Sequence, residues 1–195
     1  MKLPRSFYLR NTTTVARYLL GKYLVRRLGN QRLIGRIVEV EAYLGSRDPA
    51  SHAYRGRTRR NDVMFWVGGH LYVYFTYGMH FCANVVTCEK GIAHAVLIRA
   101  LEPVAGLEIM RRNRGRAAAR DLCNGPAKLC QALSIRRAEN GTDLCGLSIW
   151  IAARAGRAKK LKVSRSTRVG ITSGREHRWR FYLPESPFVS PGKPS

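Results

Sequence analysis

The sequence predicts an α+β fold in which a curved, mostly antiparallel β-sheet carries a protruding β-hairpin and flanking helices. Three observations support this fold class. The segment Arg32–Leu44 alternates and is rich in β-branched residues, a glycine turn joins two strand-like runs within residues 70–87, and helical patterns follow an Asn-Thr cap and two prolines. The length of 195 residues is that of one domain, so we expect a single domain over residues 1–195.

The first elements follow from capping and periodicity. Asn11 and three threonines precede apolar residues at helical spacing, which predicts a helix over residues 13–20 and then a strand near residues 24–28. In the strand Arg32–Leu44, side chains alternate between two faces, so Glu39 and Glu41 share one face. Two carboxylates on one strand face can influence each other's ionisation.

The middle of the chain predicts a hairpin and a buried strand. Residues 70–87 form two strands around Tyr77–His80, where Gly78 supplies the positive φ of a tight turn. After Gly91, an apolar strand is interrupted by Arg99. We expect Pro103 to open a helix that runs to about Arg112, because proline is tolerated in a first helical turn.

The C-terminal half reads as one more helix and several strands. A second proline-led helix is predicted over Gly125–Leu133, and strands are predicted near residues 147–152, 162–171 and 178–183.

Charge identifies the expected partner. Lys and Arg number 35 against 12 Asp and Glu, a net charge of +23, which favours nucleic acid. The 45% hydrophobic content argues against a disordered basic tail. Arginines interrupt the N-terminal apolar residues and no apolar stretch approaches the roughly 20 residues of a membrane span, so we expect a cytoplasmic protein.

The cysteines do not indicate a disulfide framework. Five cysteines are present, none in a C-x-x-C pair, and a reducing compartment fits this pattern. A metal site formed by Cys82, Cys88 and His94 is a weak alternative to small buried cysteines on strands. Motifs for nucleotide phosphates, zinc deaminases and serine hydrolases are absent. We therefore expect hydrolysis without a metal or other cofactor.

Glu41 and Arg99 are the catalytic candidates. An arginine within an apolar strand needs a carboxylate or a bound water, and Glu41 is the natural partner. Tyrosine rings and His52 on nearby strands and loops suggest a flat-walled pocket beside this pair. A purely structural Arg–Glu ion pair is the alternative.

The hairpin tip and the basic segments predict contacts with a duplex. Tyr77 and Met79 flank Gly78 as a wedge that could unstack a base step, unless the ring folds back onto the core. Arg57 and Arg59 in the run YRGRTRRN, and Lys128 at the Gly-Pro helix start, are candidates for phosphate contacts, although such charges often form only a solvated face.

Six blocks in register carry a family resemblance. The segments RIVEVEAYLG, DPASHAYRGRTRRN, LYVYFTYGMHFCANV, AVLIRALEP, CNGPAKLCQAL and RFYLPESPFVS resemble the alkyladenine (3-methyladenine) DNA glycosylases from about residue 5 to 190. This resemblance implies a monofunctional base-excision enzyme that acts on double-stranded DNA. The family flips alkylated or deaminated purines (3-methyladenine, ethenoadenine, hypoxanthine) out of the duplex and hydrolyses the N-glycosidic bond without a metal.

The resemblance also assigns roles to residues. Glu41 matches the general base and Arg99 the arginine that shares the attacking water. Tyr43, His52 and Tyr74 match the walls that stack on the extruded base, and Asn84 matches the residue that opposes the 2-amino group of guanine. Tyr77 matches the intercalating residue, with Met79 beside it.

Two departures and two rivals accompany this interpretation. His80 replaces an expected aromatic residue, and the 51–61 loop is about one residue shorter than in mammalian members. The first rival is a non-catalytic nucleic-acid binder, which leaves Glu41 and Arg99 unexplained. The second is a strand-cleaving enzyme with a lysine nucleophile, which the 8 lysines, none in the tyrosine-rich blocks, disfavour. We expect a monomer.

Overall fold

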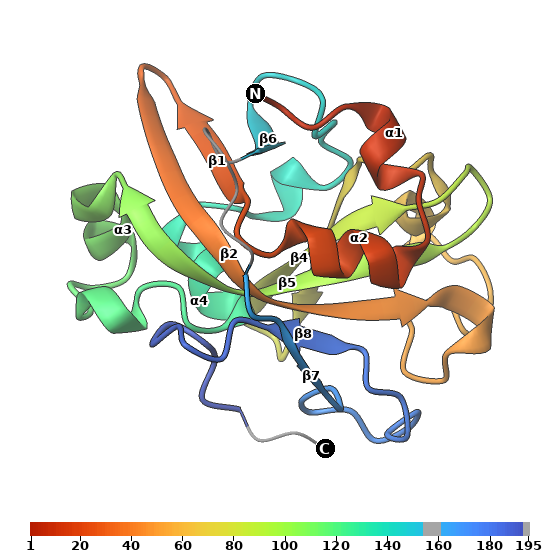
Figure 1. The fold of residues 1–195 in the computed structure, drawn as a ribbon. Coiled ribbons are helices and arrows are strands. Elements are labelled where there is room, and N and C mark those ends of the chain that lie inside the picture. Colours follow the sequence, from red (N-terminus) through yellow and green to blue (C-terminus); the bar gives the residue numbers. More distant parts are fainter. Residues whose placement is uncertain (154–160, 193–195) are drawn as a thin grey trace.

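The computed structural model describes residues 1–153 and 161–192, and these residues form one antiparallel sheet with packed helices (Figure 1). The strand order is β3-β4-β5-β2-β1-β6, and the short strand β8 pairs with both β2 and β7. The helices are α1 (Arg5–Tyr8), α2 (Thr12–Leu19), α3 (Leu107–Asn113) and α4 (Pro126–Ala132); the strands are β1 (Tyr23–Leu28), β2 (Gln31–Leu44), β3 (Leu71–Thr76), β4 (His80–Thr87), β5 (His94–Ala105), β6 (Ile149–Ala152), β7 (Ser164–Ser166) and β8 (Arg180–Tyr182). The predicted α+β class with an antiparallel sheet is confirmed.

Strand β2 is the centre of the sheet. One of its edges pairs with β5 from Ile34 to Leu44. The other edge pairs first with β1 and then, at Glu39–Glu41, with β8. Both edges of β2 are therefore hydrogen-bonded where the two glutamates lie, which fixes the backbone beneath their side chains.

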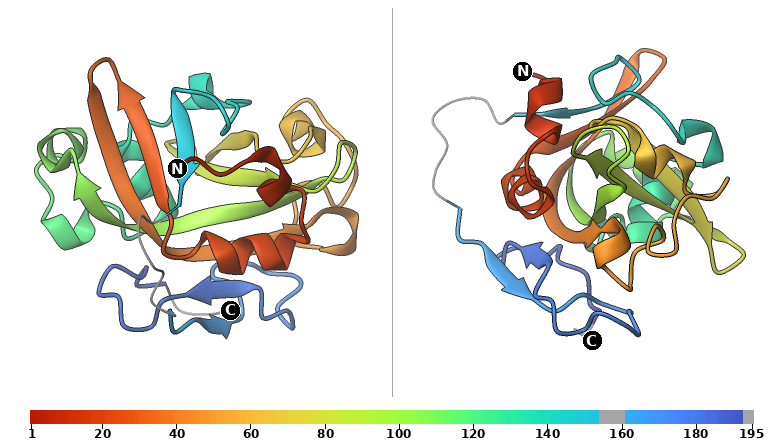
Figure 2. Two further views of the ribbon diagram at one scale, coloured as in Figure 1. Left: turned by 45° about the horizontal axis from the view of Figure 1, so that its top comes forward. Right: turned by 90° about the vertical axis from the view of Figure 1, so that its right-hand side faces the viewer.

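The two faces of β2 and β5 have different environments. Side chains such as Val40 and Ile98 point into the main core, where α2 packs on these strands with Val15 and Leu19. Figure 2 shows the sheet curling, with α2 on one side of it. Since side chains alternate along a strand, Glu41 belongs to the opposite face, which α2 leaves uncovered.

Most predicted elements are confirmed within a few residues. The helices at residues 13–20 and Gly125–Leu133 correspond to α2 and α4, and Asn11 caps α2 by accepting bonds from the amides of Thr13 and Thr14. The C-terminal strands are present but shorter, at β7 and β8. None of the helices in the described ranges is long and apolar enough to cross a membrane.

The helix predicted to begin at Pro103 is wrong. Pro103 lies within β5, opposite Gly35, next to a register shift in the β2–β5 ladder. The pairing of β4 with β5 covers only His94–Leu97. Among the described residues no strand pairs with that edge of β5 at Pro103, so the missing N–H costs little. Helix α3 begins only after Gly106, whose φ of 77° ends the strand.

Candidate active site

The register of four strands brings the site residues into rows. Tyr72 pairs with Asn84, Asn84 with Leu97, and Leu97 with Glu41, across β3, β4, β5 and β2. Adjacent strands lie about 4.8 Å apart, so this row spans about 14 Å on one face of the sheet. Tyr74 and Cys82 pair two residues further along, on the side of Arg99. The sheet itself is thus the floor of the site.

Glu39 anchors the charged end of this floor. Its carboxylate is fully buried and accepts hydrogen bonds from Arg99 Nε at 3.0 Å and Arg180 Nε at 2.7 Å. Ser190 adds its backbone N–H at 2.6 Å and its hydroxyl at 2.9 Å. Glu39 is therefore saturated by four donors, which suits a structural anchor for the two arginines rather than a free base.

Glu41 is equally buried but accepts different donors. Its Oε1 accepts the Val169 N–H at 2.7 Å, and its Oε2 accepts the Tyr43 hydroxyl at 2.9 Å and Arg99 Nη1 at 3.4 Å. Burial raises the pKa of Glu41 above its ordinary value, the charge of Arg99 and the Val169 and Tyr43 bonds oppose this, and Glu39 adds to it. The predicted pairing of Arg99 with Glu41 is present, although Arg99 is closer to Glu39.

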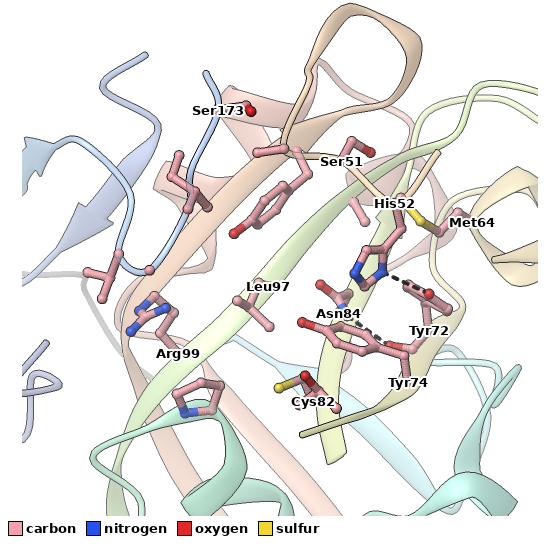
Figure 3. A pocket seen from close by; sticks show the side chains of 18 of the residues that line it. Ser51, His52, Met64, Tyr72, Tyr74, Cys82, Asn84, Leu97, Arg99 and Ser173 are labelled. Carbon is pink, nitrogen blue, oxygen red and sulfur yellow. Dashed lines mark hydrogen bonds between the residues drawn. The ribbon is translucent and has the colours of Figure 1, made fainter. Parts of the chain in front are cut away.

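A cavity of about 610 Å³ opens beside this cluster. Figure 3 shows Arg99 on one side and His52, Tyr72 and Tyr74 on the other, with Leu97 between them. His52 meets Tyr74 edge-on with ring centroids 4.4 Å apart, and its Nδ1 lies 3.0 Å from the Tyr72 hydroxyl. Tyr43 also lines the cavity. Flat rings around a cavity of this size suit a planar heterocyclic ligand.

The His52 ring is neutral at physiological pH. Desolvation, with a further contribution from the charge of Arg60, lowers its pKa to about 4. The hydroxyls of Tyr72 and Tyr74 also remain protonated, because burial raises the pKa of Tyr72 to about 12 and that of Tyr74 further. The aromatic side of the cavity is therefore uncharged.

Asn84 is fixed on the cavity floor. It is 4% exposed, and its Nδ2 donates to the Tyr72 carbonyl at 3.1 Å, as Figure 3 shows. A side chain held in this way cannot swing aside to admit an extra substituent on a ligand.

The hairpin tip projects into solvent. Tyr77 and Gly78 have φ of 50° and 67°, and the Met79 N–H closes the turn on the Thr76 carbonyl at 3.3 Å. Tyr77 is 85% exposed and Met79 70%. The alternative, in which the Tyr77 ring folds back onto the core, is therefore wrong.

The predicted phosphate-binding residues have varied surroundings. Arg57 is exposed but pairs with Asp62 at 2.6 Å, whereas Arg59 is exposed with no ion pair among the described residues. Lys128 donates to Asn124 Oδ1 at 2.8 Å and lines a second hollow, of about 420 Å³, which also contains His80 and touches Arg99. This hollow adjoins the aromatic cavity through Arg99 and Pro126.

Several residues that line or support the cavity escaped the sequence analysis. The loop 169–173 lines the cavity, and Arg168 beside it is fully buried against Asp48. Asn61 fastens the 52–58 loop by donating to the His52 and Gly56 carbonyls at 2.8 and 3.0 Å. No short motif marks these residues, because their roles depend on contacts between distant segments; the sequence indicated only a strand near residues 162–171.

The alternative metal site is wrong for the described part of the chain. Cys88 Sγ lies 3.6 Å from His94 Nδ1, but Cys82 lines the aromatic cavity instead. Within residues 1–153 and 161–192, no group of three or more His, Cys, Asp and Glu side chains could hold a metal ion.

Together, the basic chain, the flat-walled cavity and the buried carboxylate–arginine cluster define the class of an enzyme that acts on a base of a nucleic acid. The family model of methylpurine-DNA glycosylase (MPG) matches residues 6–187, so the chain belongs to this family. It is a DNA glycosylase of base excision repair, a monofunctional N-glycosylase.

The chain is also similar to bacterial proteins along almost its whole length. A protein of Carboxydothermus hydrogenoformans is 51% identical over 190 residues, covering 97% of this chain and 99% of the relative. One of Chlorobium phaeovibrioides is 48% identical over 195 residues (100% and 99%), and one of Francisella tularensis is 47% identical over 181 residues (92% and 93%). All three carry the provisional name of 3-methyladenine DNA glycosylase. The resemblance drawn from the six sequence blocks is confirmed.

Proposed function

We propose that this enzyme flips 3-methyladenine, ethenoadenine and hypoxanthine out of duplex DNA and hydrolyses the N-glycosidic bond with a water activated by Glu41, leaving an abasic site. The observation that carries the proposal is the position of Glu41. It is a fully buried carboxylate bonded to Arg99, Tyr43 and the Val169 amide, and these three residues line a cavity whose other side is aromatic. A base held against those rings presents its sugar toward the carboxylate side.

The first step is extrusion of the nucleotide. A duplex base cannot reach a cavity in the enzyme without leaving the stack, which costs a few kcal/mol. Tyr77 is exposed at the hairpin tip and also lines the cavity, so its ring is placed to fill the gap in the stack while the base enters.

The second step is attack on C1′. Glu41 as the carboxylate takes a proton from water as the sugar gains oxocarbenium character, a role that one carboxylate plays in inverting glycosidases. Arg99 is held by Glu39, donates to Glu41 and lines the cavity, so its guanidinium is placed to orient the attacking water. No cofactor takes part in this scheme.

The uncharged aromatic walls agree with the proposed substrates. A cationic base such as 3-methyladenine stacks on neutral rings without repulsion, because His52 does not carry a proton at neutral pH. A cationic purine is also a good leaving group and needs little acid assistance. Hypoxanthine is neutral, and among the described cavity residues no acid is placed as a clear donor to it.

Contacts with the DNA backbone complete the proposal. Lys128, Arg57 and Arg59 are the candidates to hold phosphates. The hollow around Lys128 adjoins the base cavity through Arg99, which is where the backbone on one side of a flipped nucleotide would pass. We expect the protein to act as a monomer on double-stranded DNA.

Excision assays on defined duplexes test the proposal. Duplexes with one hypoxanthine, one ethenoadenine or one 3-methyladenine opposite thymine are incubated with the protein and divided into samples with and without hot alkali. Strand cleavage only after alkali, for all three lesions and above the level in a sample without protein, is the expected result. Salt-dependent binding without any alkali-labile site would support the non-catalytic binder. A covalent adduct trapped by borohydride would instead support a lysine nucleophile, although no described residue lining the cavity is a lysine.

A further inference from the structure

Arg168 is a fully buried arginine outside the catalytic cluster. Its guanidinium forms a two-pronged ion pair with Asp48, Nη1 to Oδ2 at 2.5 Å and Nη2 to Oδ1 at 2.8 Å, and donates to the Ala42 carbonyl at 3.1 Å. It also lies over the rings of Tyr43 and Trp179, 4.7 and 5.1 Å from their centroids. Removing one partner of a buried ion pair is strongly destabilising. The residues that Arg168 contacts therefore show which parts of the structure it keeps in place.

These contacts reach three separate parts of the cavity wall. Asp48 accepts from the amides of Leu44 and Ala50 at 3.2 and 3.1 Å and so shapes the turn that leads to His52. Tyr43 is itself a cavity wall. Val169 follows Arg168 directly, and its N–H donates to Glu41 Oε1 at 2.7 Å.

We propose that Arg168 is a positioning residue for base excision, which holds the Val169 N–H on Glu41 and the Tyr43 ring in the cavity wall. The inference rests on the proposed role of Glu41. It goes beyond that role because it assigns the protonation state of the Glu41 carboxyl group to contacts made by Arg168 and the adjoining loop 169–173, which no sequence motif marks.

The loop is built to fit this guanidinium. Gly174 Cα lies beside it with a φ of +66°, and its carbonyl accepts from Arg168 Nη2 at 3.3 Å. A Cβ at position 174 would lie 2.9 Å from the same Nη2 and 3.3 Å from Asp48 Oδ1. Only glycine therefore allows the loop to approach this closely.

Loss of the Arg168 contacts with Asp48, Tyr43 and Gly174 has a specific consequence for Glu41. The groups that face Glu41 are Arg99 from β5, Tyr43 and Glu39 from β2, and the Val169 N–H. The neutral side chains of Tyr74 from β3 and Cys82 from β4 also interact with its charge, and Arg180 from β8 is bound to Glu39. If the Val169 N–H moves away, the carboxylate loses a donor while the charges of Arg99 and Glu39 stay. The carboxyl group then holds its proton to a higher pH.

Arg168→Lys tests the inference, because lysine keeps the charge but loses the two-pronged pair and the stacking. The matched control is Arg26→Lys, which weakens another mostly buried ion pair, Arg26 with Glu139 at 2.7 Å, whose residues do not line the cavity. Single-turnover excision is measured from about pH 5 to about pH 9 for both variants, with folding checked by circular dichroism. Gly174→Ala, which presses on the same contact, and Glu41→Gln are measured in parallel.

We expect the acid limb of the rate profile to move up by about one pH unit in Arg168→Lys and in Gly174→Ala, and to stay in place in Arg26→Lys. If the acid limb of the rate profile does not move in a folded Arg168→Lys or Gly174→Ala variant, while Glu41→Gln is inactive, the inference is overturned and the proposed function stays intact. Full activity of Glu41→Gln would instead overturn the proposed function itself.

Discussion

At the scale of single residues, the site depends on two glutamates two positions apart that have different surroundings. Glu39 accepts four hydrogen bonds and holds Arg99 and Arg180. Glu41 accepts one amide, one hydroxyl and one long arginine bond, and burial raises its pKa. The same residue type thus supplies an anchor and the proposed general base, and the difference lies in the donors around each carboxylate.

Glu41→Gln should change the pH dependence of stability. Because the pKa of Glu41 is raised on folding, the native state binds this proton more tightly than the unfolded state. The contribution of Glu41 to the free energy of unfolding is therefore full below its unfolded pKa and is lost as pH rises through the folded pKa. We expect the stability of Glu41→Gln relative to the unaltered protein to increase as the pH rises above about 4.5, the ordinary pKa of a glutamate, in urea titrations. A relative stability that falls with pH would contradict this sign.

Asn84→Ser should relax selectivity against guanine. The amide is held on the Tyr72 carbonyl, so its bulk is fixed in the cavity, and serine would leave space for a 2-amino group. Excision of guanine from an otherwise normal duplex should rise by about tenfold or more, the scale that one steric group supplies. Hypoxanthine excision by the same variant is the control for an intact site. Unchanged rejection of guanine would place the selectivity elsewhere.

At the scale of elements, local patterns specify the strands and helices, while pairing specifies the site. The alternation in residues 32–44 and the Tyr-Gly turn correctly predict β2 and the β3–β4 hairpin. The helix predicted to begin at Pro103 was wrong because proline fits a first helical turn and an unpaired strand edge equally well. The extent of the β4–β5 pairing distinguishes these two cases, and the local sequence does not show it.

The candidate site was predictable only in part for the same reason. Glu41, Arg99 and the tyrosines could be predicted as site residues, because their side-chain chemistry and the family resemblance of the blocks around them are visible in short stretches of sequence. The loop 169–173 and the pairing of β8 with Glu39–Glu41 join segments about 140 residues apart, as Glu39↔Tyr182 illustrates. No local propensity encodes such a pairing; it follows from packing of the whole sheet.

The hairpin tip carries a prediction at this scale. Tyr77→Ser should weaken the preference for lesion-containing over intact duplex by about tenfold, because stacking of one aromatic ring on a base contributes about 1–3 kcal/mol. Tyr77 is 85% exposed, so thermal stability should be unchanged. Competition binding with the two duplexes measures the effect, and an unaltered lesion preference would exclude the wedge.

At the scale of the whole molecule, the net charge of +23 makes DNA binding strongly salt-dependent. Phosphate contacts give affinity without sequence discrimination, whereas the proposed function assigns the selection of a lesion to the cavity and the hairpin. We therefore expect that DNA affinity and base excision can be altered by separate substitutions.

Lys128→Ala should weaken binding to lesion-containing and intact duplexes by the same factor. Removing one phosphate contact should also reduce the slope of log affinity against log salt by about one. Titrations at several salt concentrations measure both quantities. A loss confined to the lesion duplex would assign Lys128 to the base cavity rather than to the backbone.

The most direct measurement compares binding and excision for Glu41→Gln on a duplex with one hypoxanthine opposite thymine. Glutamine keeps the shape of the side chain but cannot take a proton from water. We predict lesion binding within about threefold of the unaltered protein and a loss of single-turnover excision of about a hundredfold or more, in the range ascribed to general base catalysis. Excision at the unaltered rate would show that Glu41 is not the base.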